Sequence, residues 1–366
     1  MSPFSTTKND SVLGRQIAFF AAFVLPVYKL LELPSVLARF AQGDLLLPAL
    51  LQFLLQAATL ALLLFFISRS EMTLFERLNA ALGKWSVLFY ALYAVYFLFA
   101  AVLPVLDLEK FVYAAFYDTP PTLFSFAVFF IFCAYFCIKG VRALGRVADI
   151  SLFLFLLPFL ALIVMSLVEA DFSNLLPFFE NRFSQSFNAL TYTAPHFSDV
   201  ALLLPLLGNL RFRKKDGTKI LLGYGTGAVC SLLFLAVFYG VYSSIAPREH
   251  YAFAKIAQYF PVLAVIGRID LLFVYMLSIV LFFLVATPLR HAVAFTSAAT
   301  GIQSRVVISA VINVAFFFFT LFCNRYYDAF YAFFGERLFP LFWVFSVLLP
   351  LILGSVLPRK KEKSDA

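Results

Sequence analysis

Two charged residues, Lys29 and Glu32, lie near the middle of the first apolar run of the chain, GRQIAFFAAFVLPVYKLLELPSVLARFAQGD. Ionisable residues at membrane depth are costly, which makes both candidates for function, and Glu32 could be the counter-ion of Lys29 or carry a proton. Pro26 and Pro34 bracket both charges, and each proline removes a hydrogen bond from a helix and clashes with its preceding turn. Two interpretations remain open. Either the charges neutralise each other in a kinked helix, or the freed backbone groups and the Lys29 ammonium line a polar site. We favour the site, because two kinks and two charges are a costly way to bend a helix.

A second apolar run, SFNALTYTAPHFSDVALLLPLLGNL, is interrupted near its middle by Pro195, His196, Ser198 and Asp199. His196 could titrate near neutral pH, and Asp199 could carry or relay a proton. Polar groups at membrane depth are costly, which makes them candidates for function. The alternative is that they form a satisfied polar pair packed against neighbouring helices.

The composition shows what kind of elements must hold these groups. Of the 366 residues, 63% are hydrophobic and only 13% are charged, and the mean hydropathy is +0.93. Soluble domains are about half apolar and about a quarter charged. The chain also contains 49 Phe and 17 Tyr, which suit lipid-facing and interfacial positions. These values exclude a water-soluble fold and predict an all-α polytopic membrane protein.

A transmembrane helix needs about 20 mostly apolar residues to cross the hydrocarbon core. Ten segments of the chain meet this requirement, so we predict about ten transmembrane helices. They are 15–40, 45–68, 85–106, 121–138, 148–168, 186–209, 220–244, 269–289, 304–323 and 338–357. The segment 71–84 has apolar residues at helical spacing and is predicted as a short interfacial helix, and 246–267 is long enough to hold another surface helix.

Lysine and arginine are distributed unevenly over the connections between these spans. Most of the 28 cationic residues fall in alternate segments, among them 211–219 and the tail 358–366. Cationic residues accumulate on the cytoplasmic side of membrane proteins, so both termini are expected in the cytoplasm. The net charge of +8 is therefore a topology signal and does not indicate a nucleic-acid partner. No cleavage site follows the first apolar run, so no signal peptide is expected.

The two interrupted runs are spans one and six, which hold corresponding places in two halves of five spans. Paired broken helices at matching positions are typical of inverted-repeat transporters of the LeuT and APC type, whose ligand site lies near the bilayer midplane. We therefore expect one transporter-like domain over 1–366. Its first repeat is about 15–168, its second about 186–323, with the final span at about 338–357 and a cytoplasmic tail at 358–366.

Other polar residues in the apolar runs favour structural roles. Gln52 and Gln56 lie four apart on one helical face and are expected to hydrogen-bond between helices. The stripe of Tyr90, Tyr93 and Tyr96 could line a pathway, but such stripes more often pack. The same holds for Cys133 and Cys137, and no disulfide framework is expected. No phosphate loop, metal motif or nucleophile motif is present in the sequence, so we expect no cofactor, no metal and no enzyme activity.

Four motifs in chain order resemble those of the spore germination GerAB family. KLLELPSVLARFAQGD is similar to the family's span-one signature, and GVRALGRVADI to its entry into span five. NLLPFFENRF and GRIDLLFVYM resemble its outer segment before span six and its opening of span eight. Each motif is weak alone, and four in order are moderately specific. Glu32 departs from the family's span-one motif, in which the corresponding residue is more often uncharged or aromatic.

The resemblance implies the amino acid–polyamine–organocation superfamily and a role as the B subunit of a germinant receptor in the spore inner membrane. Such subunits act with an A subunit and a C lipoprotein, and are thought to sense amino acids or other small nutrients. Carried over by position, the nutrient site includes two groups of residues in spans one and six: Val27, Tyr28, Lys29, Leu30 and Glu32, and Thr193, Ala194, His196 and Ser198. Glu32 and Asp199 are the candidates for proton coupling.

Three functions compete on this evidence. The first is a germinant-receptor subunit that uses a transporter fold for sensing. The second is a proton-coupled amino-acid permease, because Lys29, Glu32 and Asp199 are titratable. A membrane enzyme or scaffold is the third. The first two functions share a fold and a site, so the fold alone cannot distinguish them. The resemblance favours the receptor.

Overall fold

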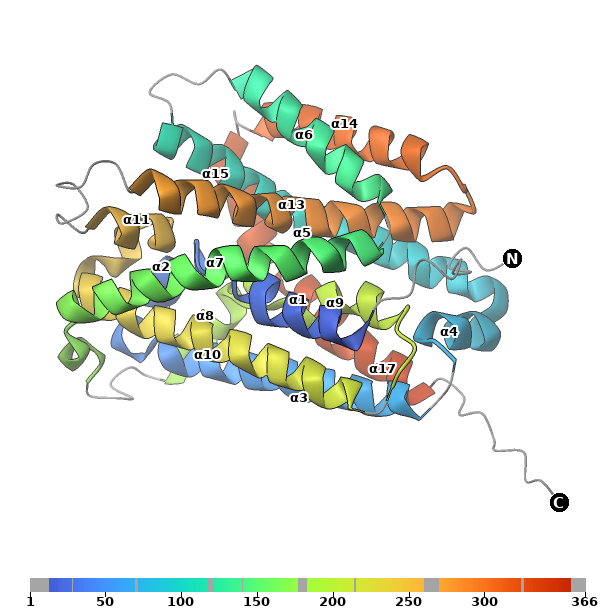
Figure 1. Ribbon diagram of the computed structural model, residues 1–366, viewed down its shortest axis with the longest axis horizontal. Coiled ribbons are helices and arrows are strands. Elements are labelled where there is room, and N and C mark those ends of the chain that lie inside the picture. Colours follow the sequence, from blue (N-terminus) through green and yellow to red (C-terminus); the bar gives the residue numbers. More distant parts are fainter. Residues whose placement is uncertain are drawn as a thin grey trace.

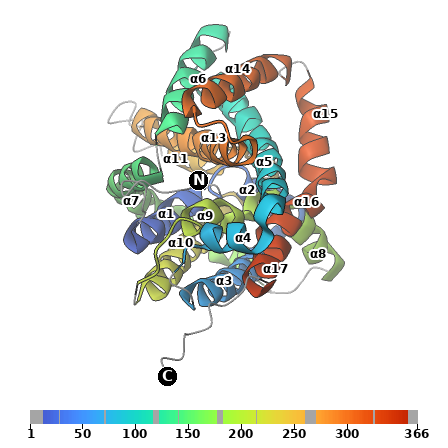
Figure 2. The same cartoon turned by 90° about the vertical axis from the view of Figure 1, so that its right-hand side faces the viewer.

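The computed structural model in Figure 1 describes residues 13–27, 29–69, 72–116, 122–139, 141–176, 183–213, 215–259, 270–323 and 326–356. Every element in these ranges is helical. Most of the long helices run along the long axis of the molecule, and the view from one end places α9 inside the bundle and α1 between α7 and α10 (Figure 2). We call the two ends the α4 end and the α11 end, after the short helices there (Figure 1).

The first half contains α1 (Gly14–Val27), α2 (Leu33–Ala41), η1 (Gln42–Asp44), α3 (Leu46–Ser68), α4 (Leu74–Leu82), η2 (Gly83–Trp85), α5 (Ser86–Phe116), α6 (Thr122–Ile138), α7 (Val141–Glu169) and η3 (Phe172–Leu175). The second half contains α8 (Phe183–Tyr192), η4 (Ala194–Phe197), α9 (Asp199–Leu207), α10 (Asp216–Tyr242), η5 (Ser243–Arg248), α11 (Ala252–Tyr259), α13 (Asp270–Thr300), α14 (Arg305–Cys323), α15 (Tyr327–Tyr331), η7 (Ala332–Arg337), α16 (Phe339–Trp343), η8 (Val344–Leu348) and α17 (Leu349–Val356).

Span one is broken where its prolines predicted. Helix α1 ends at Val27 and α2 begins at Leu33, and the residues 29–32 between them are not helical. Pro34 lies in the first turn of α2, where a backbone N–H has no acceptor within the helix, so the lack of this group in proline costs no helical hydrogen bond. Pro26 lies in the last turn of α1, where the helix stops. The predicted interruption of this span is confirmed.

Span six is broken as well. Helix α8 ends at Tyr192, a short 3-10 turn forms η4, and α9 starts again at Asp199. All nine residues of α9 are buried, so this half-helix lies inside the bundle and away from lipid. Irregular backbone at membrane depth is tolerated in such a protein-lined place. The prediction of two discontinuous helices, one in each half, is therefore confirmed.

Both short surface helices predicted from the sequence are present. Helix α4 falls within 71–84 and opens with a capping box, in which Thr73 and Glu76 satisfy each other's backbone N–H groups. Helix α11 falls within 246–267. The two helices lie at opposite ends of the bundle (Figure 1).

Five described helical stretches are long and apolar enough to cross a membrane, or six if a pair bent by 47° counts as one span. The five are Leu46–Ser68, Leu74–Leu108, Asp216–Arg248, Leu281–Thr300 and Arg305–Cys323, and the bent pair is Tyr327–Phe334 with Phe339–Ser355. Shorter apolar helices lie within the predicted spans one, four, five and six. Each predicted span thus coincides with helix, and the count of ten crossings stays a prediction.

Some predicted boundaries are wrong. Span eight was expected to end at 289, but α13 continues through Pro288 to Thr300. Span three was expected to end at 106, but α5 continues to Phe116. Hydropathy ends a span at the first polar residue, whereas a helix held by tertiary contacts continues beyond it. The last span contains one π-helical stretch, η8, and a second, η7, directly precedes it. The sequence indicated neither of them.

Helices α1 and α10 pack along a seam of small residues. A Cβ atom added to Gly223 would collide with the backbone of Ala18, and one on Gly227 would lie 2.8 Å from the Ala21 carbonyl oxygen. Small residues at such places let two membrane helices approach closely. This seam fixes α10 against α1 just before the break in span one.

The Gly223→Ala substitution should lower the thermal stability of the protein in detergent, by about 1 to 3 kcal/mol, because α1 must move away from α10. Gly225 lies in the same helix with no atom within 4 Å of its added Cβ, so Gly225→Ala is the matched control and should be neutral or slightly stabilising. Equal melting temperatures for the two variants would contradict this packing.

Candidate functional site

Lys29 opens the non-helical residues 29–32 and points into the protein. Its backbone N–H donates to the Pro26 carbonyl oxygen at 2.7 Å, which closes the last turn of α1. Its Nζ atom donates to Asp199 Oδ1 at 2.5 Å and to the Leu25 carbonyl oxygen at 3.2 Å. The two charged side chains are 0% and 1% exposed, so this is a fully buried ion pair.

Asp199 is the first residue of α9, where the helix dipole favours a negative charge. Its second oxygen, Oδ2, accepts a hydrogen bond of 2.8 Å from the Tyr224 hydroxyl of α10. The carboxylate therefore has two strong donors, one from the end of α1 and one from α10. This hydrogen-bonded group ties the two broken spans to each other and to a continuous helix.

Aromatic rings surround the Lys29 ammonium. Its Nζ lies 5.5 Å from the ring centre of Phe53 and 5.1 Å from that of Phe197. The two rings meet edge to face at 5.0 Å. A desolvated cation over such rings gains about 2 kcal/mol from each favourable contact, so the site compensates part of the cost of burying the charge.

Glu32 faces the other way, toward the α11 end. Its Oε2 lies 3.1 Å from Nδ1 of His250, and the carboxylate is 6% exposed while the imidazole is 65% exposed. The N–H groups of Ala252 and Phe253 donate to the carbonyl oxygens of Leu31 and Leu30, at 3.1 and 3.2 Å. The start of α11 therefore covers the break in span one and satisfies two of its freed carbonyls.

Lys29 and Glu32 thus have different partners in the described structure, one inside the bundle and one near its surface. The interpretation in which the two residues mainly neutralise each other does not describe this geometry. The reason is local: the i, i+3 spacing brings side chains together on a helix, and these two residues lie in a segment that is not helical.

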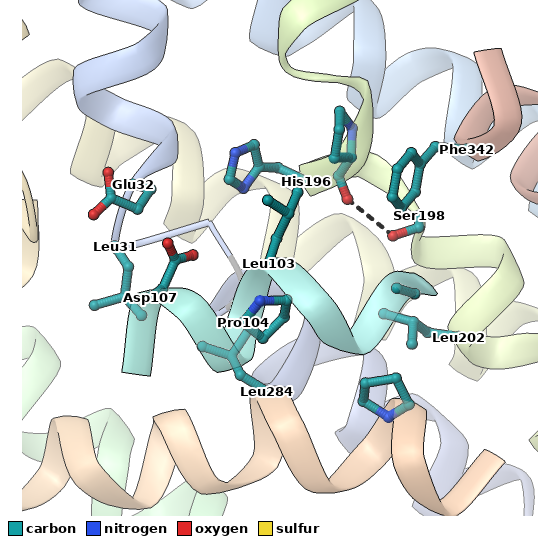
Figure 3. A pocket seen from close by; sticks show the side chains of 13 residues that line it. Leu31, Glu32, Leu103, Pro104, Asp107, His196, Ser198, Leu202, Leu284 and Phe342 are labelled. Atoms are coloured by element: carbon teal, nitrogen blue, oxygen red, sulfur yellow. Dashed lines mark hydrogen bonds between the residues drawn. The ribbon is translucent and has the colours of Figure 1, made fainter. Parts of the chain in front are cut away.

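A cavity lies beside this break, as Figure 3 shows. Its space is about 530 Å³ when the open mouth is included. The described lining comes from both broken spans and from α5, α13 and α16: Leu31, Glu32, Ala100, Leu103, Pro104, Asp107, Pro195, His196, Ser198, Leu202, Leu284, Pro288 and Phe342. Five separate elements thus border the same space.

The residues predicted for ligand binding fall into three groups. Glu32, His196 and Ser198 line the cavity. Lys29, Leu30, Thr193 and Ala194 are buried close by, but they are not part of the cavity lining. Tyr28 and the side chain of Val27 lie outside the described residues. Asp199, predicted for proton coupling, is the partner of Lys29. Which of these residues bind a ligand stays a prediction.

Two residues of this region were missed from the sequence. Asp107 lines the cavity from α5, one turn after Pro104. It was overlooked because span three was expected to end at 106, which placed this acid in a loop. Tyr224 was overlooked because a single Tyr in an apolar run gives no sign of its partner.

The glutamines and tyrosines of spans two and three behave as structural groups. The side-chain amide of Gln52 donates to the Leu190 carbonyl at 2.8 Å. Gln56 accepts from the Val200 N–H at 3.2 Å and donates to the Ser346 hydroxyl at 3.3 Å, so it joins α9 to η8. Tyr93 and Tyr96 pack against Phe345, and Tyr96 stacks on it at 4.6 Å. The predicted helix–helix hydrogen bonds and aromatic packing are confirmed.

The Asp199→Asn substitution should destabilise the protein by about 3 to 5 kcal/mol, because it leaves a buried ammonium without a counter-charge. The double variant Lys29→Met with Asp199→Asn removes both charges and should recover most of the loss. Thermal unfolding in detergent measures the stability of the single and the double variant. Glu249→Gln is the control: it weakens the partly exposed pair of Glu249 and Lys255 and should change stability by less than about 1 kcal/mol. A double variant as unstable as the single one would contradict a structural ion pair.

Comparisons with known proteins show to which family the chain belongs. No curated protein is similar enough to count as a match. A family model described as "Spore germination protein" matches residues 23–327, which include the breaks in both spans and most of the cavity lining. The chain belongs to this family of permease-like spore germination proteins, the GerAB-like family that its motifs resemble.

Proposed function

We propose that this protein is the B subunit of a spore germinant receptor and that it senses an amino acid or a similar small nutrient. The observation that carries the proposal is the cavity between the two broken spans, in a chain of the spore germination family. In transporter folds a ligand site at paired broken helices is the common arrangement. On this proposal the protein acts in the spore inner membrane with an A subunit and a C lipoprotein.

The proposal includes the architecture. Ten spans would form a five-plus-five inverted repeat, with both termini in the cytoplasm and the α4 end facing it. The matching breaks in spans one and six support the repeat. The distribution of lysine and arginine supports the orientation.

A ligand in the cavity would contact five elements that can move relative to one another: the break before α2, the η4–α9 segment, α5, α13 and α16. A ligand shifts a conformational equilibrium only as far as it binds one arrangement better than another. Lys29 and Asp199 hold the end of α1 against α9 in the arrangement described. We propose that ligand binding changes how the remaining elements close around the cavity, and that the A subunit detects this change.

A proton-coupled amino-acid permease is the second candidate, and one observation favours it. The Asp199 carboxylate is buried between two donors, Lys29 and Tyr224, where gain of a proton would release the ammonium from its partner. Such a group can couple proton movement to helix movement. The two functions differ in one measurable respect, since only the permease accumulates the labelled nutrient.

The Ala100→Phe substitution tests the cavity. Ala100 lines it, and a phenyl ring there would occupy the space of a ligand. We expect spores carrying this variant to need at least tenfold more nutrient for half-maximal germination, with an unchanged amount of the protein in the membrane. Ala58→Phe, at an exposed position of α3, is the matched control and should germinate as wild type.

Three outcomes would count against the proposal, two of them against the receptor and one against the cavity as its nutrient site. Spores without the gene that germinate normally on every nutrient would exclude it, and they would support the permease if growing cells also lost uptake of a labelled amino acid. A normal response from Ala100→Phe would place the nutrient elsewhere in the receptor. The absence of genes for an A subunit and a C lipoprotein beside this gene would weaken the proposal in the same way.

A further inference from the structure

Helix α13 continues beyond the cavity, and the residues that follow the cavity are polar and buried. Pro288 lines the cavity, and Arg290 and His291 come directly after it, at 3% and 0% exposure. Span eight was expected to end at 289, so the sequence placed both residues in a loop. Ionisable side chains inside a membrane protein are costly, which makes this pair a candidate for function.

His291 joins α13 to the broken span six. Its Nε2 lies 3.1 Å from the carbonyl oxygen of Leu202 in α9, and its Nδ1 lies 3.3 Å from Nη1 of Arg290. The nitrogens of a guanidinium group only donate, so Nδ1 accepts and the ring proton is on Nε2, which donates to Leu202. Arg290 therefore holds His291 in the tautomer that binds α9.

This contact lies between the cavity and the α4 end, toward which α13 runs (Figure 1). Leu202 itself lines the cavity, as Figure 3 shows. Beyond it α9 ends, and the Gly208 carbonyl accepts a hydrogen bond of 3.3 Å from the Phe75 N–H of α4. Along α13, His291 is followed one turn later by Phe295, whose ring centre lies 5.7 Å from that of Phe75.

Buried aromatic rings surround His291 at this level. Phe97 of α5 lies three residues before Ala100 of the cavity lining, and its ring centre is 5.0 Å from that of His291. Tyr93 and Phe295 stack on each other at 5.6 Å, and Phe295 also contacts Phe97 at 5.6 Å. The rings exclude water, while the directional hydrogen bond of His291 fixes the position of α9 along α13.

Helix α9 is short and depends on contacts of this kind. It has nine residues, and Pro205 inside it cannot donate to the Ala201 carbonyl. At its start, the side chain of Gln56 accepts the Val200 N–H at 3.2 Å. So short a helix is held in place chiefly by tertiary contacts, and loss of the bond to His291 would free its middle from α13.

We infer that Arg290 and His291 form a latch that closes the cavity toward the α4 end by holding α9 against α13. This inference rests on the proposed function of the cavity and adds how that site is regulated. Leu202 and Pro288 line the cavity directly beside the latch, one on each helix. A ligand that binds better when α9 and α13 are apart shifts the equilibrium toward the arrangement in which the latch is released.

Thiol labelling in membrane vesicles tests the latch. Ala100→Cys places a thiol in the cavity lining, and Lys84→Cys places one at an exposed position of the α4 end. A charged, membrane-impermeant methanethiosulfonate reaches the α4 end in those vesicles in which it labels Lys84→Cys. In these vesicles Ala100→Cys should react at least tenfold more slowly than Lys84→Cys. The chain without an introduced cysteine gives the background from its four native cysteines.

Substitutions of His291 test what closes the cavity. His291→Phe keeps a ring against Phe97 but removes both nitrogens, so Ala100→Cys should react at least fivefold faster from the α4 side. His291→Gln keeps an amide donor for the Leu202 carbonyl and should restore most of the protection. Thr300→Val removes an exposed hydroxyl group of the same helix and is the control, with the wild-type rate. The melting temperature of each variant in detergent separates a released latch from an unfolded chain.

The wild-type comparison decides even if a variant fails to fold. Equal rates for Ala100→Cys and Lys84→Cys would show a cavity that is open at the α4 end and would overturn the inference. An unchanged rate in a folded His291→Phe variant, or the same increase in His291→Gln or Thr300→Val, would overturn it too.

Spores test whether the latch opposes the response. Those that carry His291→Phe should germinate in buffer without nutrient at least tenfold more often than wild-type spores, because the closed arrangement is no longer held. Wild-type behaviour of these spores, with a normal amount of the protein, would overturn the regulatory role of the latch. The proposed function fails on a separate result, normal germination of spores that lack the gene, and the labelling rates then still decide whether the latch exists.

Discussion

The buried pair of Lys29 and Asp199 is the interaction on which the arrangement of the other elements depends. An ammonium and a carboxylate removed from water cost several kcal/mol each, and their attraction offsets this only in good geometry with further hydrogen bonds. The structure supplies both, through the Leu25 carbonyl, the Tyr224 hydroxyl and two aromatic rings. The depth of Lys29 therefore determines where α9 must begin, 170 residues later in the chain.

The same constraint explains why both spans are broken. Asp199 can meet Lys29 as the first residue of a half-helix, because the helix dipole favours a negative charge at that end. Lys29 can meet Asp199 because α1 has already ended. The break then leaves carbonyl groups without helical partners, and the start of α11 provides donors for two of them. A cavity remains beside the break because two interrupted helices cannot fill the space that two continuous ones would occupy.

The sequence was sufficient to predict the breaks, because prolines and charges inside apolar runs indicate where the backbone leaves the helical conformation. It also predicted α4 and α11, whose capping residues and apolar spacing are local signals. The partner of Lys29 was beyond such reasoning. Glu32 is near in sequence, but a non-helical segment turns the two side chains apart, and Asp199 becomes the partner through the packing of α1 on α10 and α9. Asp107 was missed because hydropathy ends a span where polar residues begin, while α5 continues beyond that point.

The described acids and cations of this region divide into two sets by what surrounds them. Lys29 and Asp199 are enclosed by α1, α9 and α10 and by aromatic rings, so their charges are used within the protein. Glu32 and Asp107 line the cavity, and Glu32 also lies 3.1 Å from the exposed His250. A buried pair stabilises one arrangement of the elements that carry it, because the loss of either partner leaves the other charge buried and unpaired. In this protein the cation predicted to bind the ligand forms a buried pair with Asp199, while Glu32, its neighbour in the sequence, lies at the cavity wall.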